Sequence, residues 1–462
     1  AEWIIRDLRE GSPDGTDRLD TIERLNFRNL KDVAFDLVNP LPVNDLINVA
    51  ASGPYTIAAS TLLGNDIDLQ GGALSITSVL NPVGGTVAIS GSNVIFTPTA
   101  GSGFMSFQYK IKDAQNNPGA LIGIIGDPGA GTAEAKGTVF LRTPDMPLDP
   151  LLRDQWYVNE IDLLKVWKDY SGHGVNIAVT DPGNFDPLHV DLDDNFGTAW
   201  REDGSGGVRD TTTHATMVAG VIGAERNGVG SVGVAYGATL NSIAVPQTSG
   251  GDLSNMLLWK NYDIVNNSWG FSNRYGANFL VDTGIASAFA QTAAYGRGGL
   301  GTVNIFAAGN LRADGGNAND ANVTNSRYAI AVGAVNHRGD LGALVIGTNP
   351  FSSPGANILV SAPGSNISST GRLVQNPQGS TFGDDYETAQ GTSLATPIVS
   401  GVVALMLEAN PTLGYRDVQD ILALAAKRVD DSNPGWAWNG AKNWNGGAMH
   451  INHDYGFGEI DA

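Results

Sequence analysis

From about residue 151 onward, short apolar strands alternate with helical stretches, and this alternation restricts the fold more than any other feature of the chain. The strands carry few polar positions, as in VNIAVT before Asp181 and TVNIFAAGN ending at Asn310. Strands that are apolar on both faces are typical of a parallel sheet covered by helices on both sides. We therefore predict an α/β fold for residues 151–462, with functional side chains at the carboxyl ends of strands or at adjoining helix starts.

Residues 36–143 follow a second pattern, in which short β-runs are separated by turns. In GFMSFQYKIKD every second residue is apolar, which places one strand face in a core and predicts an all-β, Ig-like sandwich. The polar residues 1–35 resemble segments that flank the glycine-rich calcium repeats of bacterial RTX proteins. The Pro-rich residues 144–150 indicate a linker between the sandwich and the α/β domain.

One segment of the sandwich, LLGNDIDLQGGALSITSV, resembles cadherin-like, Ig-type repeats of large bacterial surface proteins. Asn65, Asp66 and Asp68 offer amide and carboxylate oxygens, which are the ligands that calcium prefers. A polar hairpin turn is the other interpretation of these three residues.

The composition excludes several classes of function. The chain has 47 acidic and 27 basic residues and a formal net charge of −20, whereas nucleic acid binding needs clustered Lys and Arg. The absence of cysteine excludes disulfides, thiolate catalysis and Cys-ligated metal sites. No apolar run approaches the length of a membrane span. We expect a monomeric module with no nucleic-acid partner and no membrane span.

Four polar residues stand where a predicted strand ends or a predicted helix begins. A serine hydroxyl is a weak nucleophile at neutral pH, and it needs a histidine to take its proton and an acid to orient that histidine. Asp181, His214 and Ser393 follow one another in the chain order of the subtilisin type. Asn310 can donate to the oxyanion of a tetrahedral intermediate, together with the backbone N–H of Ser393. Each residue alone also fits a strand-end turn, a helix entry or a helix N-cap.

The same segments resemble the subtilase family of serine proteases, and within it the kexin/furin-like branch. The resemblance covers roughly residues 147–462 and rests on GTSLATPIVSGVVALMLEANP, HATMVAGVIGAERNGVGSVGVAY, AAGN, NNSWG and DYGFGEIDA. It implies a subtilisin-like fold in which Ser393 is the nucleophile and His214 the general base. It also implies that Asp181 orients the histidine and that Asn310 is the oxyanion donor.

The resemblance further implies a calcium site around the loop that follows the histidine helix. Its ligands would be two carboxylates, one amide oxygen and three backbone oxygens, from Asp149, Asp191, Asn227, Ala224, Val229 and Ser231. A hard cation prefers oxygen ligands of this mixed type. The other interpretation is a glycine-rich loop without an ion.

The sequence departs from the family at several positions. The acid motif reads Asp181-Pro182-Gly183, and Ala215 replaces the glycine usual after the histidine. Asn273 stands where a kexin-like enzyme has an acid for a basic substrate side chain, and Asp320 is the candidate for the other acid. With one carboxylate missing, the preference for Arg or Lys before the cut should weaken.

These observations predict a calcium-dependent serine endopeptidase that works through an acyl-enzyme. We expect it to be secreted or on the surface of a bacterium and to process its RTX-type parent protein or other extracellular proteins. Its partner is then a polypeptide substrate, including segments of its own parent. The alternative is a non-enzymatic adhesin or binding module with a degenerate protease fold.

Overall fold

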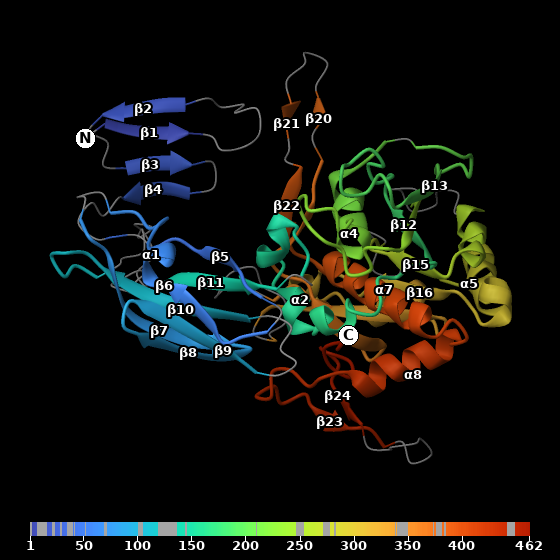
Figure 1. Ribbon diagram of the computed structural model, residues 1–462. Helices are drawn as coiled ribbons and strands as arrows, with labels where there is room; N and C mark the ends of the chain where they lie inside the picture. Colours follow the sequence, from blue (N-terminus) through green and yellow to red (C-terminus); the bar gives the residue numbers. More distant parts are fainter. Residues whose placement is uncertain are drawn as a thin grey trace. The chain divides into compact units, whose positions relative to one another are not determined.

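The structure is a computed structural model, and it describes residues 2–6, 16–20, 24–27, 30–34, 40, 42–50, 52–68, 72–99, 105–118, 136–143, 146–208, 210–245, 254–270, 278–280, 283–337, 339, 350–372, 374–375, 381–382, 385–440 and 449–462. The chain divides into two compact units, Ala1–Met146 and Pro147–Ala462 (Figure 1). The division lies inside the segment 144–150.

The first unit is built of β-strands. Two antiparallel pairs come first, β1 (Glu2–Arg6) with β2 (Thr16–Asp20) and β3 (Arg24–Phe27) with β4 (Leu30–Ala34). Two sheets follow, with the strand orders β5-β11-β10-β7 and β6-β9-β8. Their elements are β5 (Asp45–Asn48), β6 (Tyr55–Ala58), the short helix α1 (Ala59–Leu62), β7 (Ser75–Val83), β8 (Gly85–Ser90), β9 (Asn93–Pro98), β10 (Met105–Lys112) and β11 (Gly137–Arg142).

The core of this unit lies between the two sheets. The alternating apolar residues of β10 are buried, as the sequence predicts, and Phe107 among them is fully enclosed. Its ring stacks on that of Phe96 in β9 of the other sheet, with ring centroids 6.0 Å apart. Side chains from two facing sheets thus share one core, which confirms the Ig-like sandwich.

The second unit contains a parallel sheet of seven strands in the order β13-β14-β12-β15-β16-β17-β18. Every neighbouring pair in it is parallel. The strands are β12 (Asn176–Asp181), β13 (Phe196–Trp200), β14 (Thr239–Ala244), β15 (Ile264–Asn267), β16 (Val303–Ala307), β17 (Ala329–Val335) and β18 (Ile358–Pro363). The α/β fold predicted from strand–helix alternation is confirmed.

Helices cover both faces of this sheet. On one face α5 (Thr283–Tyr295) packs Phe289 against Trp259, from the 3-10 helix η2 (Ser254–Asn261), and against Phe306 of β16. On the other face lie α4 (Thr213–Gly223) and α7 (Thr392–Ala409), which contact each other, while α7 runs along β15 to β18 (Figure 1).

Shorter elements complete the second unit. They are η1 (Pro150–Asp154), α2 (Tyr157–Glu160), α3 (Leu163–Val166), η3 (Gly296–Gly299), η4 (Arg312–Asp314), η5 (Ala318–Asp320), α6 (Asn322–Asn325), β19 (Ile367–Thr370), β20 (Val374–Gln375), β21 (Thr381–Phe382), β22 (Tyr386–Ala389), α8 (Tyr415–Ala425), β23 (Ala437–Trp438) and β24 (His450–Ile451).

The helix α7 has 18 residues and a mean hydropathy of 1.5, which by length and composition alone would let it cross a membrane. The sequence expectation that no apolar run approaches this length therefore overlooked it. Since 78% of its residues are buried inside the unit, α7 is the central helix of a packed core. It is the one such helix in the described ranges.

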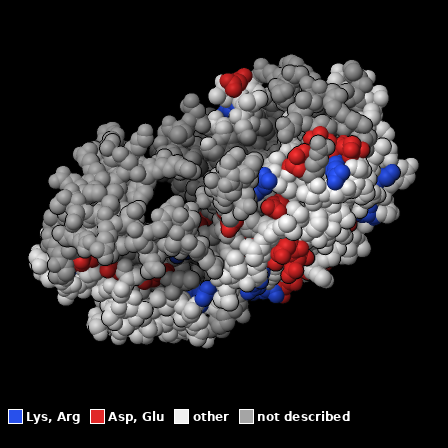
Figure 2. Space-filling model, turned by 90° about the horizontal axis from the view of Figure 1, so that it is seen from above, with Lys and Arg blue, Asp and Glu red and all other residues white. Residues whose placement is uncertain are grey.

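The described surface carries charges of both signs. On the face in Figure 2, Asp and Glu side chains gather in small clusters with Lys and Arg side chains between them. Both signs are present on this face although the chain as a whole has a formal net charge of −20. A net charge of this size favours solubility.

Candidate active site

The candidate acid, Asp181, is the last residue of β12 and is 2% exposed. His214 is the second residue of α4, which begins after Thr212, whose hydroxyl accepts a hydrogen bond from the Ala215 N–H at 3.1 Å. The imidazole Nδ1 lies 2.9 Å from Asp181 Oδ2 and 3.0 Å from Oδ1. A carboxylate in this position holds the proton on Nδ1, so Nε2 keeps its lone pair and can act as a base.

The pairing of Asp181 with His214 also sets the proton affinity of the imidazole. Burial lowers the pKa of His214, but the hydrogen bond and the negative charge of Asp181 raise it more, so this pKa lies above its ordinary value. A more basic imidazole takes up a hydroxyl proton more readily.

Ser393, the candidate nucleophile, is the second residue of α7 and is 9% exposed. Gly391 precedes this helix, and a Cβ added to it would lie 2.9 Å from Ser393 Oγ and 3.3 Å from Asn310 Nδ2. The hydroxyl and the amide therefore face the same small space, and only a glycine at position 391 leaves that space open.

The amide of Asn310 is held in one orientation. Its Oδ1 accepts a hydrogen bond from the Thr392 N–H and another from the Thr392 hydroxyl, each at 2.9 Å. The Nδ2 group borders the same space beside Gly391 as Ser393 Oγ. An N–H donor beside the nucleophile lies where the carbonyl oxygen of an attacked amide gains negative charge.

The backbone of Ser393 is held by a side chain from the sheet. In a regular helix the N–H of residue 397 would donate to the Ser393 carbonyl, but Pro397 has no N–H. That carbonyl accepts instead from the Ser268 hydroxyl at 2.8 Å. Asn266 Nδ2 donates to Ser268 Oγ at 3.0 Å, and the Ser400 hydroxyl of α7 donates to Asn266 Oδ1 at 2.8 Å. Ser393 is therefore tied to the residue that directly follows β15.

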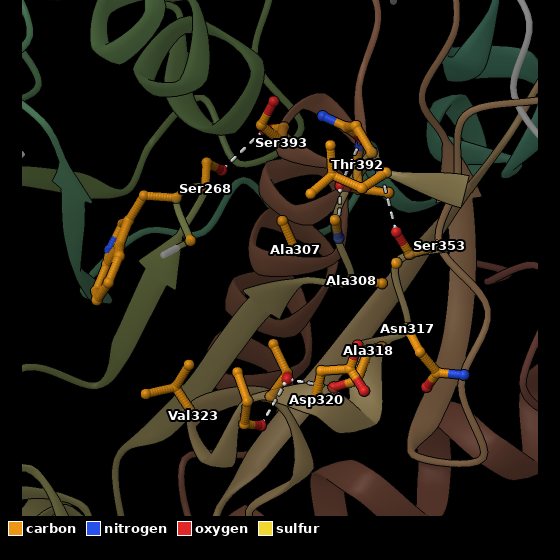
Figure 3. Close-up of a pocket in the computed structure, with 18 of the residues that line it drawn as sticks. Ser268, Ala307, Ala308, Asn317, Ala318, Asp320, Val323, Ser353, Thr392 and Ser393 are labelled. Carbon is orange, nitrogen blue, oxygen red and sulfur yellow. Dashed lines mark hydrogen bonds between the residues drawn. The ribbon is translucent and has the colours of Figure 1, made fainter. Parts of the chain in front are cut away.

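A pocket opens beside these residues, and His214, Asn310 and Ser393 all line it. Figure 3 shows Ser393 at one end, Asp320 at the other, and the small side chains Ala307 and Ala308 between them. Asp320, one of the two substrate residues predicted from the sequence, therefore lines the same pocket as Ser393. Asn273, the other substrate residue predicted from the sequence, lies outside the described residues.

The two carboxylates predicted to bind calcium both lie against the loop after α4. Asp149 Oδ1 accepts the N–H groups of Asn227 and Gly228, at 3.2 and 3.0 Å. Asp191 Oδ2 accepts the Ser231 N–H at 3.0 Å. The second oxygens, Asp149 Oδ2 and Asp191 Oδ1, are buried and have no hydrogen-bond partner. Burial raises the pKa of Asp149 and raises that of Asp191 to about 6.

Two of the other predicted ligand oxygens already accept hydrogen bonds. Asn227 Oδ1 already accepts the Val229 N–H at 2.8 Å, and the Ala224 carbonyl accepts the Gly233 N–H at 2.8 Å. In the described ranges no group of three or more Asp, Glu or His side chains converges as a metal site. Two buried, unsatisfied carboxylate oxygens around one loop nevertheless fit an oxygen-ligated cation, because burying them without a partner is costly.

Three contributing residues were not singled out from the sequence. Thr392 orients Asn310, and Ser268 fixes Ser393. Tyr386 closes over the loop that follows α4, since a Cβ on Gly230 would lie 2.0 Å from the phenol ring and its oxygen. The sequence signals the need for one of them, because Pro397 stands four residues after Ser393 and leaves that carbonyl without its helical donor, but it does not identify Ser268 as the replacement.

A buried carboxylate on an imidazole, a serine at a helix start and an amide donor beside it, set on a doubly covered parallel sheet, define a serine hydrolase with an Asp-His-Ser triad. Comparison with known families agrees. The chain belongs to the subtilase family, whose model matches residues 172–458, and residues 38–121 match a bacterial Ig domain.

Individual relatives support the family and its kexin-like branch. Kexin of Saccharomyces cerevisiae is 31% identical over 343 residues, which are 68% of this chain and 39% of that protein. Human furin is 27% identical over 337 residues, which are 68% of this chain and 40% of furin. A solved serine protease of Aeromonas sobria has a TM-score of 0.59 and 25% identity, over 68% of this chain and 66% of that one. The chain spans about two fifths of the length of its curated relatives.

Proposed function

We propose that residues 147–462 hydrolyse internal peptide bonds of polypeptides. The observation that carries this proposal is the contact of His214 Nδ1 with the buried Asp181 carboxylate, next to a nucleophile and an amide donor that share one small space. A binding module would not need a carboxylate that fixes the tautomer of His214. Nor would it need the Asn310 amide beside the Ser393 hydroxyl.

The reaction proceeds in two halves. His214 takes the proton of Ser393 as Oγ attacks the scissile carbonyl, and Asn310 Nδ2 with the Ser393 N–H stabilises the oxyanion. The imidazolium then gives its proton to the leaving amine, which leaves an acyl-enzyme. Water deprotonated by His214 attacks this ester and releases the acid.

A calcium ion is part of the proposal. Asp149 and Asp191 would hold it, together with the amide oxygen of Asn227 and backbone oxygens of Ala224, Val229 and Ser231. When bound, the ion neutralises two buried carboxylates and stabilises the folded state, because it binds that state alone. The melting temperature should rise with calcium and fall with chelator, and Asp191→Asn should lose most of this difference. A melting temperature that does not respond to calcium would contradict the site.

For substrates, we propose a partial preference for Lys or Arg before the cut, read by Asp320 at the end of the pocket. Asp320→Asn should then lower kcat/KM for peptides with Arg before the cut, and leave peptides with Leu there unchanged. Cleavage-site profiling on a peptide library measures both. Equal losses for both peptide classes would assign Asp320 a structural role.

The biological setting is proposed from the accompanying domain. A bacterial Ig domain together with a bacterial serine protease as structural neighbour supports an extracellular bacterial protein. Processing of an RTX-type parent protein, or of neighbouring extracellular proteins, would suit this arrangement.

The decisive experiment separates the enzyme from a binding module with a protease fold. A serine-reactive phosphonate should label the chain in the presence of calcium, and Ser393→Ala should abolish the adduct. The matched control, Ser287→Ala on the exposed side of α5, should be labelled like the parent. An adduct that survives Ser393→Ala, or no adduct at all, would sink the protease proposal.

A further inference from the structure

The strand β22 leads almost directly into the nucleophile, because it ends at Ala389 and α7 begins at Thr392. His214 and Ser393 come from separate segments of the chain, and the hydrogen bonds of each run to other residues. Because a misplacement of about 1 Å can cost about 10²-fold in rate, proton transfer between the two depends on how firmly β22 is held against α4.

On one side, β22 is held on α4 through its partner strand β19. The two strands pair antiparallel, with Thr370 opposite Tyr386. The Thr370 hydroxyl donates to the Thr216 carbonyl of α4 at 2.7 Å, and the Ser369 hydroxyl donates to the Met217 carbonyl at 2.8 Å. Both carbonyls follow the histidine closely on its own helix. The hairpin of β19 and β22 is therefore bound to the element that carries the general base.

On the other side, the Tyr386 ring holds the start of β22 on the loop that follows α4. The ring lies over Gly230, where an added Cβ would overlap it. Gly230 has a φ of 49°, a left-handed conformation that favours glycine. The edge of the ring system also meets His189, with ring centroids 5.3 Å apart and planes at 90°. The loop backbone is thus shaped to leave room for an aromatic ring.

His189 adds a hydrogen bond at the same point. Its Nδ1 accepts the Asp191 N–H at 3.1 Å, so the ring proton lies on Nε2. Nε2 then donates to the Asp385 carbonyl at 2.9 Å, and Asp385 directly precedes Tyr386. His189 is 7% exposed, which keeps water from competing for this bond. The ring contacts and this hydrogen bond therefore hold the same end of β22.

The Tyr386 hydroxyl contributes less than its ring. It is buried and has no hydrogen-bond partner, whereas the ring meets both Gly230 and His189. Tyr386 is also not among the residues that line the pocket beside Ser393. Losing the ring should therefore disturb the nucleophile and leave the walls that receive the substrate in place.

We propose that Tyr386 is a positioning residue for Ser393. Its ring, seated between Gly230 and His189, sets where β22 approaches α4, and so aligns the nucleophile with His214. The inference rests on the proposed protease function and adds to it a residue outside the pocket.

Kinetics on the full chain, in excess calcium, compare the parent with two variants. Tyr386→Leu removes the ring and should lower kcat on a fluorogenic peptide about ten-fold or more, with KM close to the parental value. The rate of labelling by a serine-reactive phosphonate should fall in parallel. Tyr386→Phe keeps the ring and should retain parental values of all three.

Two further variants separate positioning from stability. Leu422→Ala opens a cavity in the buried face of α8 and should lower the free energy of unfolding while kcat stays parental. His189→Asn removes the contact with the Tyr386 ring and the bond to Asp385, so it should lower kcat in the same direction as Tyr386→Leu. It provides the test if Tyr386→Leu does not fold.

Hydrogen–deuterium exchange tests the same contact without using activity. In a chain that carries Ser393→Ala, Tyr386→Leu should speed exchange in peptides that cover β22 and the first turn of α7. Tyr386→Phe should leave these peptides at the parental rate. Peptides from α8 should exchange equally in all three proteins.

Four results would overturn the positioning role. They are parental kcat in Tyr386→Leu, equal losses in Tyr386→Leu and Tyr386→Phe, a loss that falls on KM alone, and unchanged exchange of β22 in Tyr386→Leu. Recovery of kcat only at higher calcium would also count against it, because the ring would then act through an ion. A parent chain that the phosphonate does not label contradicts the protease proposal instead, and the exchange of β22 still decides whether the ring holds the strand.

Discussion

At the scale of single residues, the site depends on side chains whose orientation is fixed by their neighbours. Asn310 is the clearest case, because Thr392 occupies its oxygen twice and leaves its nitrogen facing Ser393. An orientation set in advance costs nothing when charge develops on the substrate, which is how such donors accelerate acyl transfer.

Replacing Asn310 by Ala should lower kcat about 10²–10³-fold, equivalent to about 3–4 kcal/mol of transition-state stabilisation, with little change in KM. Steady-state kinetics on a fluorogenic peptide measure this. Asn410→Ala, at the far end of α7, is the matched control and should retain parental kinetics. A loss that falls on KM instead of kcat would mean that Asn310 binds the substrate in its ground state.

The fall of kcat/KM at low pH should report the protonation of His214. The base must be deprotonated to act, and Asp181 raises its pKa above the ordinary value, so kcat/KM should fall as the pH drops through a pKa higher than 6.5. Asp181→Asn removes the charge that raises this pKa. Its residual activity should be about 10⁴-fold lower in kcat, and its acid limb should move to lower pH. An acid limb that stays in place would mean that another group controls the profile.

The chain order of polar residues at strand ends and helix starts was enough to predict Asp181, His214, Asn310 and Ser393 as one constellation. The same reasoning missed Asp45 as a neighbour of Asp66. The first opens a strand and the second follows a turn, and only the tertiary fold brings both beside Tyr109 of β10. Contacts made by tertiary packing leave no periodic pattern in the sequence, so they could not be predicted from it.

At the scale of elements, the start of α7 is adapted to present a nucleophile. Pro397 removes the hydrogen bond that would have occupied the Ser393 carbonyl, and Ser268 supplies a replacement from the sheet. The first turn of the helix is thereby tied to β15. Strand–helix alternation predicted both elements, but it gave no strand order, and so no means of pairing residue 268 with residue 393.

Ser268→Ala should leave the Ser393 carbonyl buried without a donor. The expected loss is about 1–3 kcal/mol in the free energy of unfolding, together with a lower kcat, because the nucleophile is less firmly held. Ser268→Thr keeps the hydroxyl and should restore most of both. Urea unfolding and steady-state kinetics measure the two effects. If stability falls while kcat is unchanged, the hydroxyl serves the fold alone.

At the scale of the whole second unit, the backbone at Glu459 pairs with two segments that are far apart in the sequence. Glu459 forms backbone bridges with Lys427, just after α8, and with Ser361 in β18. Its side chain is 3% exposed, and Oε1 has no hydrogen-bond partner. Burial, with the charges of Glu160 and Asp461 added to it and that of Lys427 opposing it, raises its pKa to about 8. The folded unit therefore holds a proton that the unfolded chain releases near the ordinary value of 4.5.

The free energy of unfolding should consequently fall as the pH rises from about 4.5 to about 8, because over this interval the folded state binds more protons than the unfolded state. Glu459→Gln keeps the shape of the side chain without its charge, so its stability should decline less and should exceed that of the parent at pH 8. The net charge of −20 adds a general repulsion that also grows with pH. The exposed control Glu202→Gln loses the same charge and should follow the parent's slope. Urea unfolding across this pH range separates the two causes, and parallel slopes for Glu459→Gln and Glu202→Gln would assign the whole effect to net charge.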